Sequence, residues 1–132
     1  MTERLLIVLA LAALMLAVAL LARARARRQA AGLVGAAVPD ELRSRLGGGP
    51  GIVYFYGPHC GSCRQQAREL DALEPAYPVV RLDATRETAM ADSLRVATVP
   101  ATAVVDRAGR VRALNVGYRP GRALTEQLAQ VV

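Results

Sequence analysis

The amino-acid sequence predicts an α/β fold in which a mixed four-stranded sheet is flanked by helices and preceded by an N-terminal transmembrane helix. Two observations carry this prediction. One is an uninterrupted apolar run near the N-terminus, and the other is the order in which strand and helix patterns follow it. The chain has 132 residues, which leaves room for one compact domain after the apolar run.

Residues 5–22 form the apolar run and contain no charge, glycine or proline. At about 1.5 Å per residue, a helix of this length just spans the hydrocarbon core of a bilayer. Four of the next six residues are arginine, which is typical of a stop at the membrane surface and unlike the cleavage region of a signal peptide. We therefore expect residues 1–28 to be a single-pass anchor in the cell membrane with an arginine-rich collar. A cleaved signal peptide and a buried core helix stay open as alternatives.

The charges around the apolar run favour one orientation of the anchor. Arginines are retained on the cytoplasmic face, and the collar carries four of them whereas the N-terminal side carries Arg4. This difference favours a cytoplasmic domain over an extracytoplasmic one. Residues 29–38 are uncharged and rich in alanine and glycine, which predicts a short linker to a domain over residues 39–132.

The overall charge indicates little about ligands. All 17 basic residues are arginine and the formal net charge is +6. From residue 39 onward, twelve arginines accompany ten acidic residues, a net charge of only +2. The excess therefore lies beside the membrane segment, and with no tryptophan and one phenylalanine for base stacking we expect no nucleic-acid binding.

The elements of the domain follow from hydrophobic periodicity and from glycine and proline breaks. A short helix is expected over residues 40–46, before a loop rich in glycine. Residues 52–56 are β-branched or aromatic and uncharged, which is typical of a central strand. The remaining elements expected in chain order are a helix over 60–74, a strand over 79–82, a helix over 85–95, strands over 101–105 and 111–116 joined by a tight turn, and a helix over 121–131.

The two cysteines, Cys60 and Cys63, lie where the central strand is expected to give way to a helix. One pair cannot build a disulfide framework, so the spacing indicates redox or metal chemistry. Backbone N–H groups and the helix dipole at a helix N-terminus favour a thiolate, which makes Cys60 the expected nucleophile. Cys63 lies one turn further on, close enough to attack a mixed disulfide on Cys60 and release the product.

The segment around the cysteines, Phe-Tyr-Gly-Pro-His-Cys-Gly-Ser-Cys, resembles the active-site segment of the thioredoxin family. Residues 98–102, Thr-Val-Pro-Ala-Thr, are similar to the cis-proline loop of that family, and Gly117 resembles the glycine beside the same groove. The resemblance covers the chain from residue 51 onward. It implies a thioredoxin-like fold and a protein-disulfide oxidoreductase, in which Pro100 is the cis-proline and Val99 contacts an extended substrate segment.

Two positions depart from the family pattern. His59 stands where the family commonly has tryptophan, and Tyr54 stands where it has a buried acid that assists proton transfer. An imidazolium at His59 would stabilise a thiolate on Cys60, although a plain surface role stays open. Arg64 would add positive charge beside Cys63, and a solvated side chain is its alternative. His59, Tyr54 and Arg64 are thus candidate tuning residues.

The expected redox centre is the Cys60–Cys63 disulfide itself, without a further cofactor. No flavin or nicotinamide fingerprint occurs, so electrons would come from another protein or a small thiol and pass to protein thiols or disulfides. A thiolate site for zinc or copper is an alternative, but a structural zinc site needs four ligands and one pair supplies two; we predict no metal. A non-catalytic anchored interaction domain is the other alternative. The direction of exchange stays open between reduction, oxidation and isomerisation.

Overall fold

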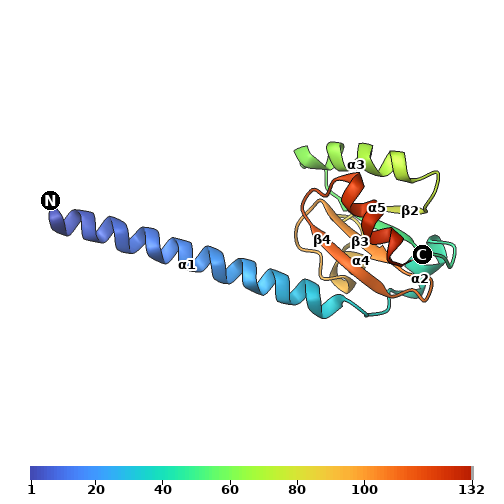
Figure 1. Ribbon diagram of the computed structural model, residues 1–132, viewed down its shortest axis with the longest axis horizontal. Helices are drawn as coiled ribbons and strands as arrows, with labels where there is room; N and C mark the ends of the chain where they lie inside the picture. The colour runs from blue at the N-terminus through green and yellow to red at the C-terminus, as the bar shows by residue number, and fades with distance from the viewer. Residues whose placement is uncertain (132) are drawn as a thin grey trace.

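The computed structural model describes residues 1–131, apart from the side chain of residue 30 (Figure 1). A long helix comes first, and the smaller α/β domain follows it. In chain order the elements are α1 (Thr2–Leu33), α2 (Asp40–Arg45), β1 (Gly51–Tyr56), α3 (Gly61–Leu73), β2 (Val79–Asp83), α4 (Thr88–Ser93), β3 (Ala101–Val105), β4 (Val111–Val116) and α5 (Gly121–Ala129).

Within residues 1–131 the sheet has four strands in the order β2-β1-β3-β4. β1 is parallel to β2 and antiparallel to β3, and β3 is antiparallel to β4. The sheet is therefore mixed, with β1 in the interior, as expected. Because β1 ends and β3 begins at the same end of the sheet, the turn after Tyr56 and the loop before Ala101 lie close together there.

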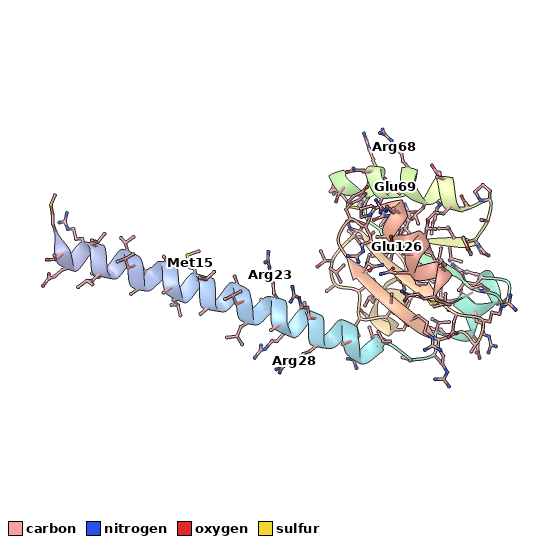
Figure 2. The ribbon with its side chains drawn as sticks, viewed as in Figure 1. Met15, Arg23, Arg28, Arg68, Glu69 and Glu126 are labelled. Carbon is pink, nitrogen blue, oxygen red and sulfur yellow. A yellow bond between two sulfur atoms is a disulfide. The ribbon has the colours of Figure 1, made fainter. Side chains whose placement is uncertain are left out.

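The N-terminal helix projects away from the domain for most of its length. Its most apolar 18-residue window has a mean hydropathy of 3.1, and none of that window is buried. Figure 2 shows the Met15 side chain on this free part and Arg23 and Arg28 pointing to opposite sides. The length and composition of α1 fit a membrane-spanning helix, and they fit an N-terminal signal sequence equally.

The segment expected as a linker, residues 29–38, has a different local structure. α1 continues through it to Leu33, whose side chain is only 6% exposed. Gly35 N–H then donates to the Val111 carbonyl oxygen at 2.7 Å, and Val38 N–H donates to the Gly109 carbonyl oxygen at 2.8 Å. The alanine-rich composition propagates the helix, and the unpaired edge of β4 supplies partners for the residues after it.

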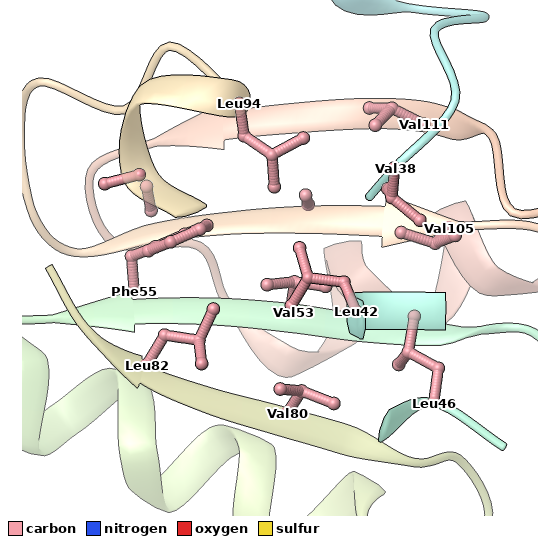
Figure 3. Close-up of a cluster of buried hydrophobic side chains, with 13 residues drawn as sticks. Val38, Leu42, Leu46, Val53, Phe55, Val80, Leu82, Leu94, Val105 and Val111 are labelled. Carbon is pink, nitrogen blue, oxygen red and sulfur yellow. The ribbon is translucent and has the colours of Figure 1, made fainter. Parts of the chain in front are cut away.

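The strand β1 contributes side chains to two hydrophobic cores, because alternate residues of a strand point to opposite faces. Val53 and Phe55 pack with α2 and α4 in the core that Figure 3 shows. Ile52 and Tyr54 pack with α3 and α5 on the other face. The helices that cover this second face contribute Leu70, Leu124 and Leu128.

α4 begins later than the periodicity predicts. The carboxylate of Asp83 accepts hydrogen bonds from the Thr85 backbone N–H at 2.9 Å and from its hydroxyl at 2.6 Å. This side chain holds residues 83–85 in a turn, which competes with helix formation. The helix therefore starts at Thr88 rather than at residue 85.

Asp106 is a buried acid in the turn between β3 and β4. Its carboxylate accepts hydrogen bonds from the backbone N–H groups of Ala108 and Arg110 and forms an ion pair with Arg112, whose Nε lies at 2.7 Å. Burial alone would raise the pKa of this carboxyl. The hydrogen bonds and the guanidinium outweigh burial, so the pKa of Asp106 lies below its ordinary value.

We expect an Asp106→Asn variant to lose stability at pH 7 and to show a weaker pH dependence in acid. Because the pKa is lower in the folded than in the unfolded state, the contribution of Asp106 is present at neutral pH and disappears as the pH falls through the folded pKa. Urea unfolding at pH 7 and pH 3 measures both effects. Asp92→Asn, at an exposed position on α4, is the control, and equal pH dependence in wild type and Asp106→Asn would contradict the prediction.

Candidate redox site

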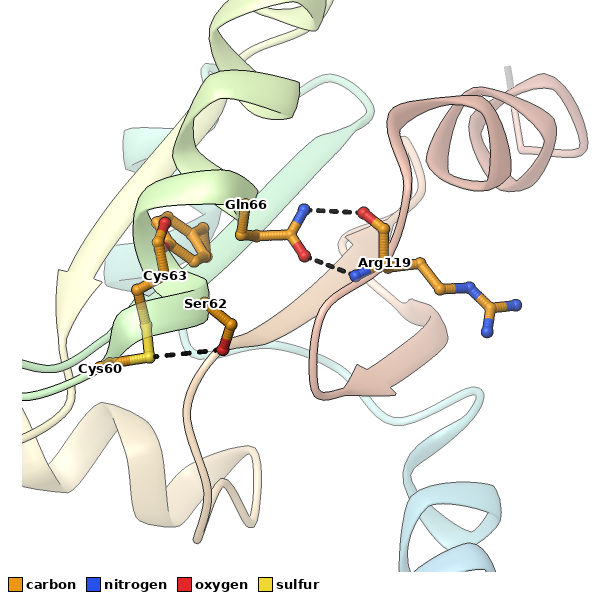
Figure 4. The surroundings of a disulfide bond; sticks show 6 residues. Cys60, Ser62, Cys63, Gln66 and Arg119 are labelled. Carbon is orange, nitrogen blue, oxygen red and sulfur yellow. Dashed lines mark hydrogen bonds between the residues drawn. A yellow bond between two sulfur atoms is a disulfide. The ribbon is translucent and has the colours of Figure 1, made fainter.

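Cys60 and Cys63 lie at the junction of β1 and α3. β1 ends at Tyr56, and Cys60 precedes the first helical residue with an extended backbone conformation, φ −123° and ψ 105°. The two cysteines form a disulfide, with their Cα atoms 5.3 Å apart (Figure 4). Cys60 is partly exposed whereas Cys63 is 6% exposed. An incoming sulfur can therefore reach Cys60 more easily than Cys63.

The surroundings of Cys60 favour negative charge on its sulfur after reduction. It caps a 13-residue helix, so the unpaired N–H groups and the positive end of the helix dipole lie beside it. Ser62 Oγ lies 3.9 Å from Cys60 Sγ, and since a disulfide sulfur carries no hydrogen, the hydroxyl is the donor. Gly61 and Ser62 are small and exposed, which leaves the sulfur open to a partner.

The loop before β3 lies at the same edge of the sheet. The peptide bond between Val99 and Pro100 is cis. A Cβ atom added to Gly57 would lie 3.1 Å from Val99 Cγ2, so the Val99 side chain packs beside the backbone that leads to Cys60. Gly117 has a φ of +88°, a left-handed conformation that favours glycine, and its N–H donates to the Pro100 carbonyl oxygen at 2.8 Å.

Tyr54 lies beneath the first turn of α3. Its side chain is 2% exposed, and its hydroxyl donates a hydrogen bond to the Cys63 carbonyl oxygen at 2.9 Å. Burial raises the pKa of this phenol, so it stays neutral at physiological pH. In the described structure Tyr54 therefore holds the first turn of α3 against β1.

We expect a Tyr54→Phe variant to lower the free energy of unfolding by about 1 kcal/mol, the typical net contribution of such a hydrogen bond. Urea unfolding of the full chain in mild detergent measures this change. Tyr56→Phe is the matched control, because the Tyr56 hydroxyl has no hydrogen-bond partner within residues 1–131. A Tyr54→Phe variant as stable as the control would show that the hydrogen bond adds nothing.

The other two candidate tuning residues, His59 and Arg64, are both exposed. Arg64 lines a cleft of about 340 Å³ together with Cys60 and Cys63. Arg81 also reaches this cleft, but its charge is shared with Asp71 at 2.7 Å and Glu74 at 3.3 Å. Arg64 is therefore the less neutralised positive charge beside the disulfide. His59 makes no hydrogen bond or ion pair with the residues that the structure describes.

Two residues that the sequence analysis missed hold α3 against the loop after β4. Gln66 is fully buried; its Nε2 donates to the Arg119 carbonyl oxygen at 2.9 Å and its Oε1 accepts from Arg119 N–H at 2.7 Å (Figure 4). Glu69 accepts hydrogen bonds from the Tyr118 hydroxyl and from Gly121 N–H. These contacts join α3 to the segment that begins at Gly117. The one sequence feature that indicates Gln66 is its position on the apolar side of the expected helix.

Metal ligands do not gather around the cysteines. Across residues 1–131, no group of three or more histidine, cysteine, aspartate and glutamate side chains is arranged to hold a metal ion. The two sulfurs that the zinc or copper alternative would use are joined to each other. The described part of the chain thus gives no observation in favour of that alternative.

The fold and the site define a class of protein, an α/β domain with a redox-capable disulfide at a helix N-terminus beside a cis-proline loop. Residues 38–130 match the family model described as Thioredoxin, and the chain belongs to the thioredoxin family. Both the expected family and the expected fold are confirmed.

Similar proteins agree with this membership. Protein disulfide-isomerase A4 of Bos taurus is 30% identical over an alignment of 87 residues that covers 61% of this chain and 13% of that protein, so the chain spans a small part of this relative. A mutant thioredoxin from Halobacterium salinarum has a TM-score of 0.64 at 20% identity, covering 72% of this chain and 86% of that one. Fasciola hepatica thioredoxin has a TM-score of 0.61 at 21% identity, covering 70% and 90%. The two structures share the fold.

Proposed function

We propose that this chain is a thiol-disulfide oxidoreductase that exchanges disulfides with protein substrates and is tethered to the membrane by α1. The observation that carries the proposal is the Cys60–Cys63 disulfide at the N-terminus of α3, with the more exposed sulfur at the edge of the sheet where Pro100 lies. Membership of the thioredoxin family supports this chemistry. The similarity to part of a protein disulfide-isomerase is consistent with it.

The proposed exchange uses the two sulfurs in sequence. In the reducing direction the Cys60 thiolate attacks one sulfur of a substrate disulfide, forms a mixed disulfide and releases the first substrate thiolate, which takes a proton. The Cys63 sulfur, after loss of its proton, attacks Cys60 Sγ, restores the internal disulfide and releases the second substrate thiolate. Two electrons pass to the substrate, and the reverse sequence oxidises a substrate dithiol.

Neighbouring residues are proposed to bind the substrate backbone and to adjust the sulfurs. Val99 would offer backbone hydrogen bonds to an extended segment, and Pro100 and Gly117 would shape the groove beside Cys60. Tyr54 would keep α3 in place, while Arg64 and His59 would add positive charge near a thiolate. The electron donor or acceptor on the other side of the cycle is proposed to be a second protein or a small thiol.

The proposed tether is α1, inserted through residues 5–22 in the cell membrane. The exposed apolar surface of this helix and the four arginines that follow the apolar run support membrane insertion, and the same arginines favour the cytoplasmic side for the domain. Protease accessibility of the domain in intact cells, compared with inside-out vesicles, tests the side.

The full chain in mild detergent tests the enzymatic proposal. We expect it to accelerate the reduction of insulin disulfides by dithiothreitol, measured as the onset of insulin precipitation. A redox titration of the Cys60–Cys63 pair against glutathione then gives its reduction potential, which distinguishes a reductant from an oxidant. Insulin reduction no faster than with dithiothreitol alone would refute the proposal.

A further inference from the structure

The helix α1 runs antiparallel to β4. It leaves the domain at the end of the sheet where Cys60 and Pro100 lie, which is called the disulfide edge below. Its C-terminal residue Leu33 is followed closely by Gly35, which bonds to Val111 at the start of β4. Seven residues before Leu33, Ala26 lines a small cavity with Val116 at the end of β4, and it lines a larger one with Val116 and Arg119. Figure 1 agrees, because the first turn of α3 lies at the end of the domain from which α1 projects.

The end of β4 that α1 passes is part of the candidate site. Gly117 follows this strand directly and donates its N–H to the Pro100 carbonyl oxygen. Thr98, two residues before Pro100, lines the same small cavity as Ala26 and Gln29 of α1. The remaining residues of α1 therefore extend in the direction that the disulfide edge faces.

Only a short stretch of helix separates this edge from the apolar run. The run ends at Ala22, four residues before Ala26, which is about 6 Å along an α-helix. Exposed arginines lie near this stretch of helix: Arg25 and Arg27 on α1 and, on the domain, Arg119, which lines the same cavity as Ala26. Positive charge at this height suits the anionic headgroups of a bilayer.

The attachment of α1 to the domain is specific rather than flexible. The Leu33 side chain is almost fully buried, and the backbone of residues 35–38 is hydrogen-bonded to β4 and the turn before it. Arg110 Nη1 also donates to the Gly35 carbonyl oxygen at 2.8 Å. The domain would consequently keep one face toward the membrane instead of turning freely on a tether.

We propose, on the basis of the membrane-tethered oxidoreductase proposed above, that the disulfide edge faces the membrane surface and exchanges with cysteines of an integral membrane protein at the lipid–water boundary. In this orientation a cysteine at the end of a transmembrane helix would lie near the depth of Cys60, whereas a large water-soluble protein would have to fit between the disulfide and the headgroups. The exchange is the two-step reaction described above, and the partner's cysteine pair gains or supplies the two electrons.

A full-length Cys63→Ser variant in lipid nanodiscs tests this orientation. The probe is a single-span peptide with one cysteine held as a mixed disulfide with thionitrobenzoate. Attack by Cys60 joins the chain to the peptide and releases one thionitrobenzoate thiolate, which is measured by its absorbance. We expect the initial rate to be at least tenfold higher with the cysteine at the lipid boundary than with it moved about 30 Å outward on a ten-residue proline spacer. Equal rates, or a faster reaction of the extended probe, would overturn the proposal.

A matched variant separates orientation from simple confinement to the membrane. Ten glycine and serine residues inserted between Arg28 and Gln29 keep the anchor and both cysteine positions of the probe, but they break α1 between Ala26 and the buried Leu33, so that the anchor is no longer rigidly joined to the domain. We expect the insertion to reduce the tenfold ratio to about one, and an unchanged ratio would also overturn the fixed orientation. The insulin assay in detergent is independent of the bilayer, so an active chain without depth preference loses only this inference, whereas an inactive chain loses the proposed function.

Discussion

A Cys60→Ser substitution should reduce insulin turnover by the full chain on the order of a thousandfold or more, because it removes the sulfur that forms the mixed disulfide. Cys60 is the more exposed member of the pair and caps α3. The reaction is measured in detergent with dithiothreitol as electron source. Comparable turnover by Cys60→Ser and wild type would show that the pair takes no part in the reaction.

The matched variant Cys63→Ser should fail at a different step. Its remaining thiolate still attacks a substrate disulfide, but the mixed disulfide has no resolving sulfur, so the covalent complex accumulates. Non-reducing electrophoresis followed by mass spectrometry detects this complex. Its accumulation on Cys60→Ser instead, with none on Cys63→Ser, would reverse the assigned order of the two sulfurs.

A Phe55→Ala substitution should lower the free energy of unfolding of the domain by about 3–5 kcal/mol. Phe55 is the one phenylalanine in the sequence, is fully buried, and lies in the core between β1, α2 and α4. Its loss leaves a cavity that the sheet and helices can fill only in part. Because small domains are stable by only about 5–15 kcal/mol, the change should be visible as a large shift of the urea midpoint.

Val116→Ala is the control for this prediction. Val116 is also a strand residue, but its side chain is 57% exposed, so the change should stay within about 0.5 kcal/mol. Similar midpoints for Phe55→Ala and Val116→Ala would mean that the core around Phe55 contributes much less than its burial indicates.

The strands of the sheet could be predicted closely from the sequence. β3 and β4 begin and end where the patterns place them, because their β-branched residues are bounded by proline and by a glycine turn. The start of α4 could not be, since it depends on hydrogen bonds from a single side chain, Asp83. The structure of residues 29–38 depends on β4, which lies more than 70 positions later in the chain.

The residues of the candidate site that belong to short sequence patterns could be predicted. The cysteine spacing and the strand-to-helix junction indicated Cys60 and Cys63 directly, and the resemblance to a known family indicated the loop at Pro100. Gln66 was missed because its partner Arg119 is 53 residues away. No short-range pattern distinguishes a glutamine that bonds to a distant backbone from one that faces water.

The backbone pairing of residues 35–38 also decides where the domain can be cut. β4 is an outer strand, and Ala37 forms a bridge with Arg110 while its neighbours bond to the same region. A fragment that begins at Pro39 would leave the backbone N–H and C=O groups of residues 109–111 without these hydrogen-bond partners. It would also remove the buried side chains of Leu33 and Val38. A strand edge with unpaired backbone groups promotes edge-to-edge association between molecules. A soluble fragment should therefore begin before Leu33 to remain monomeric.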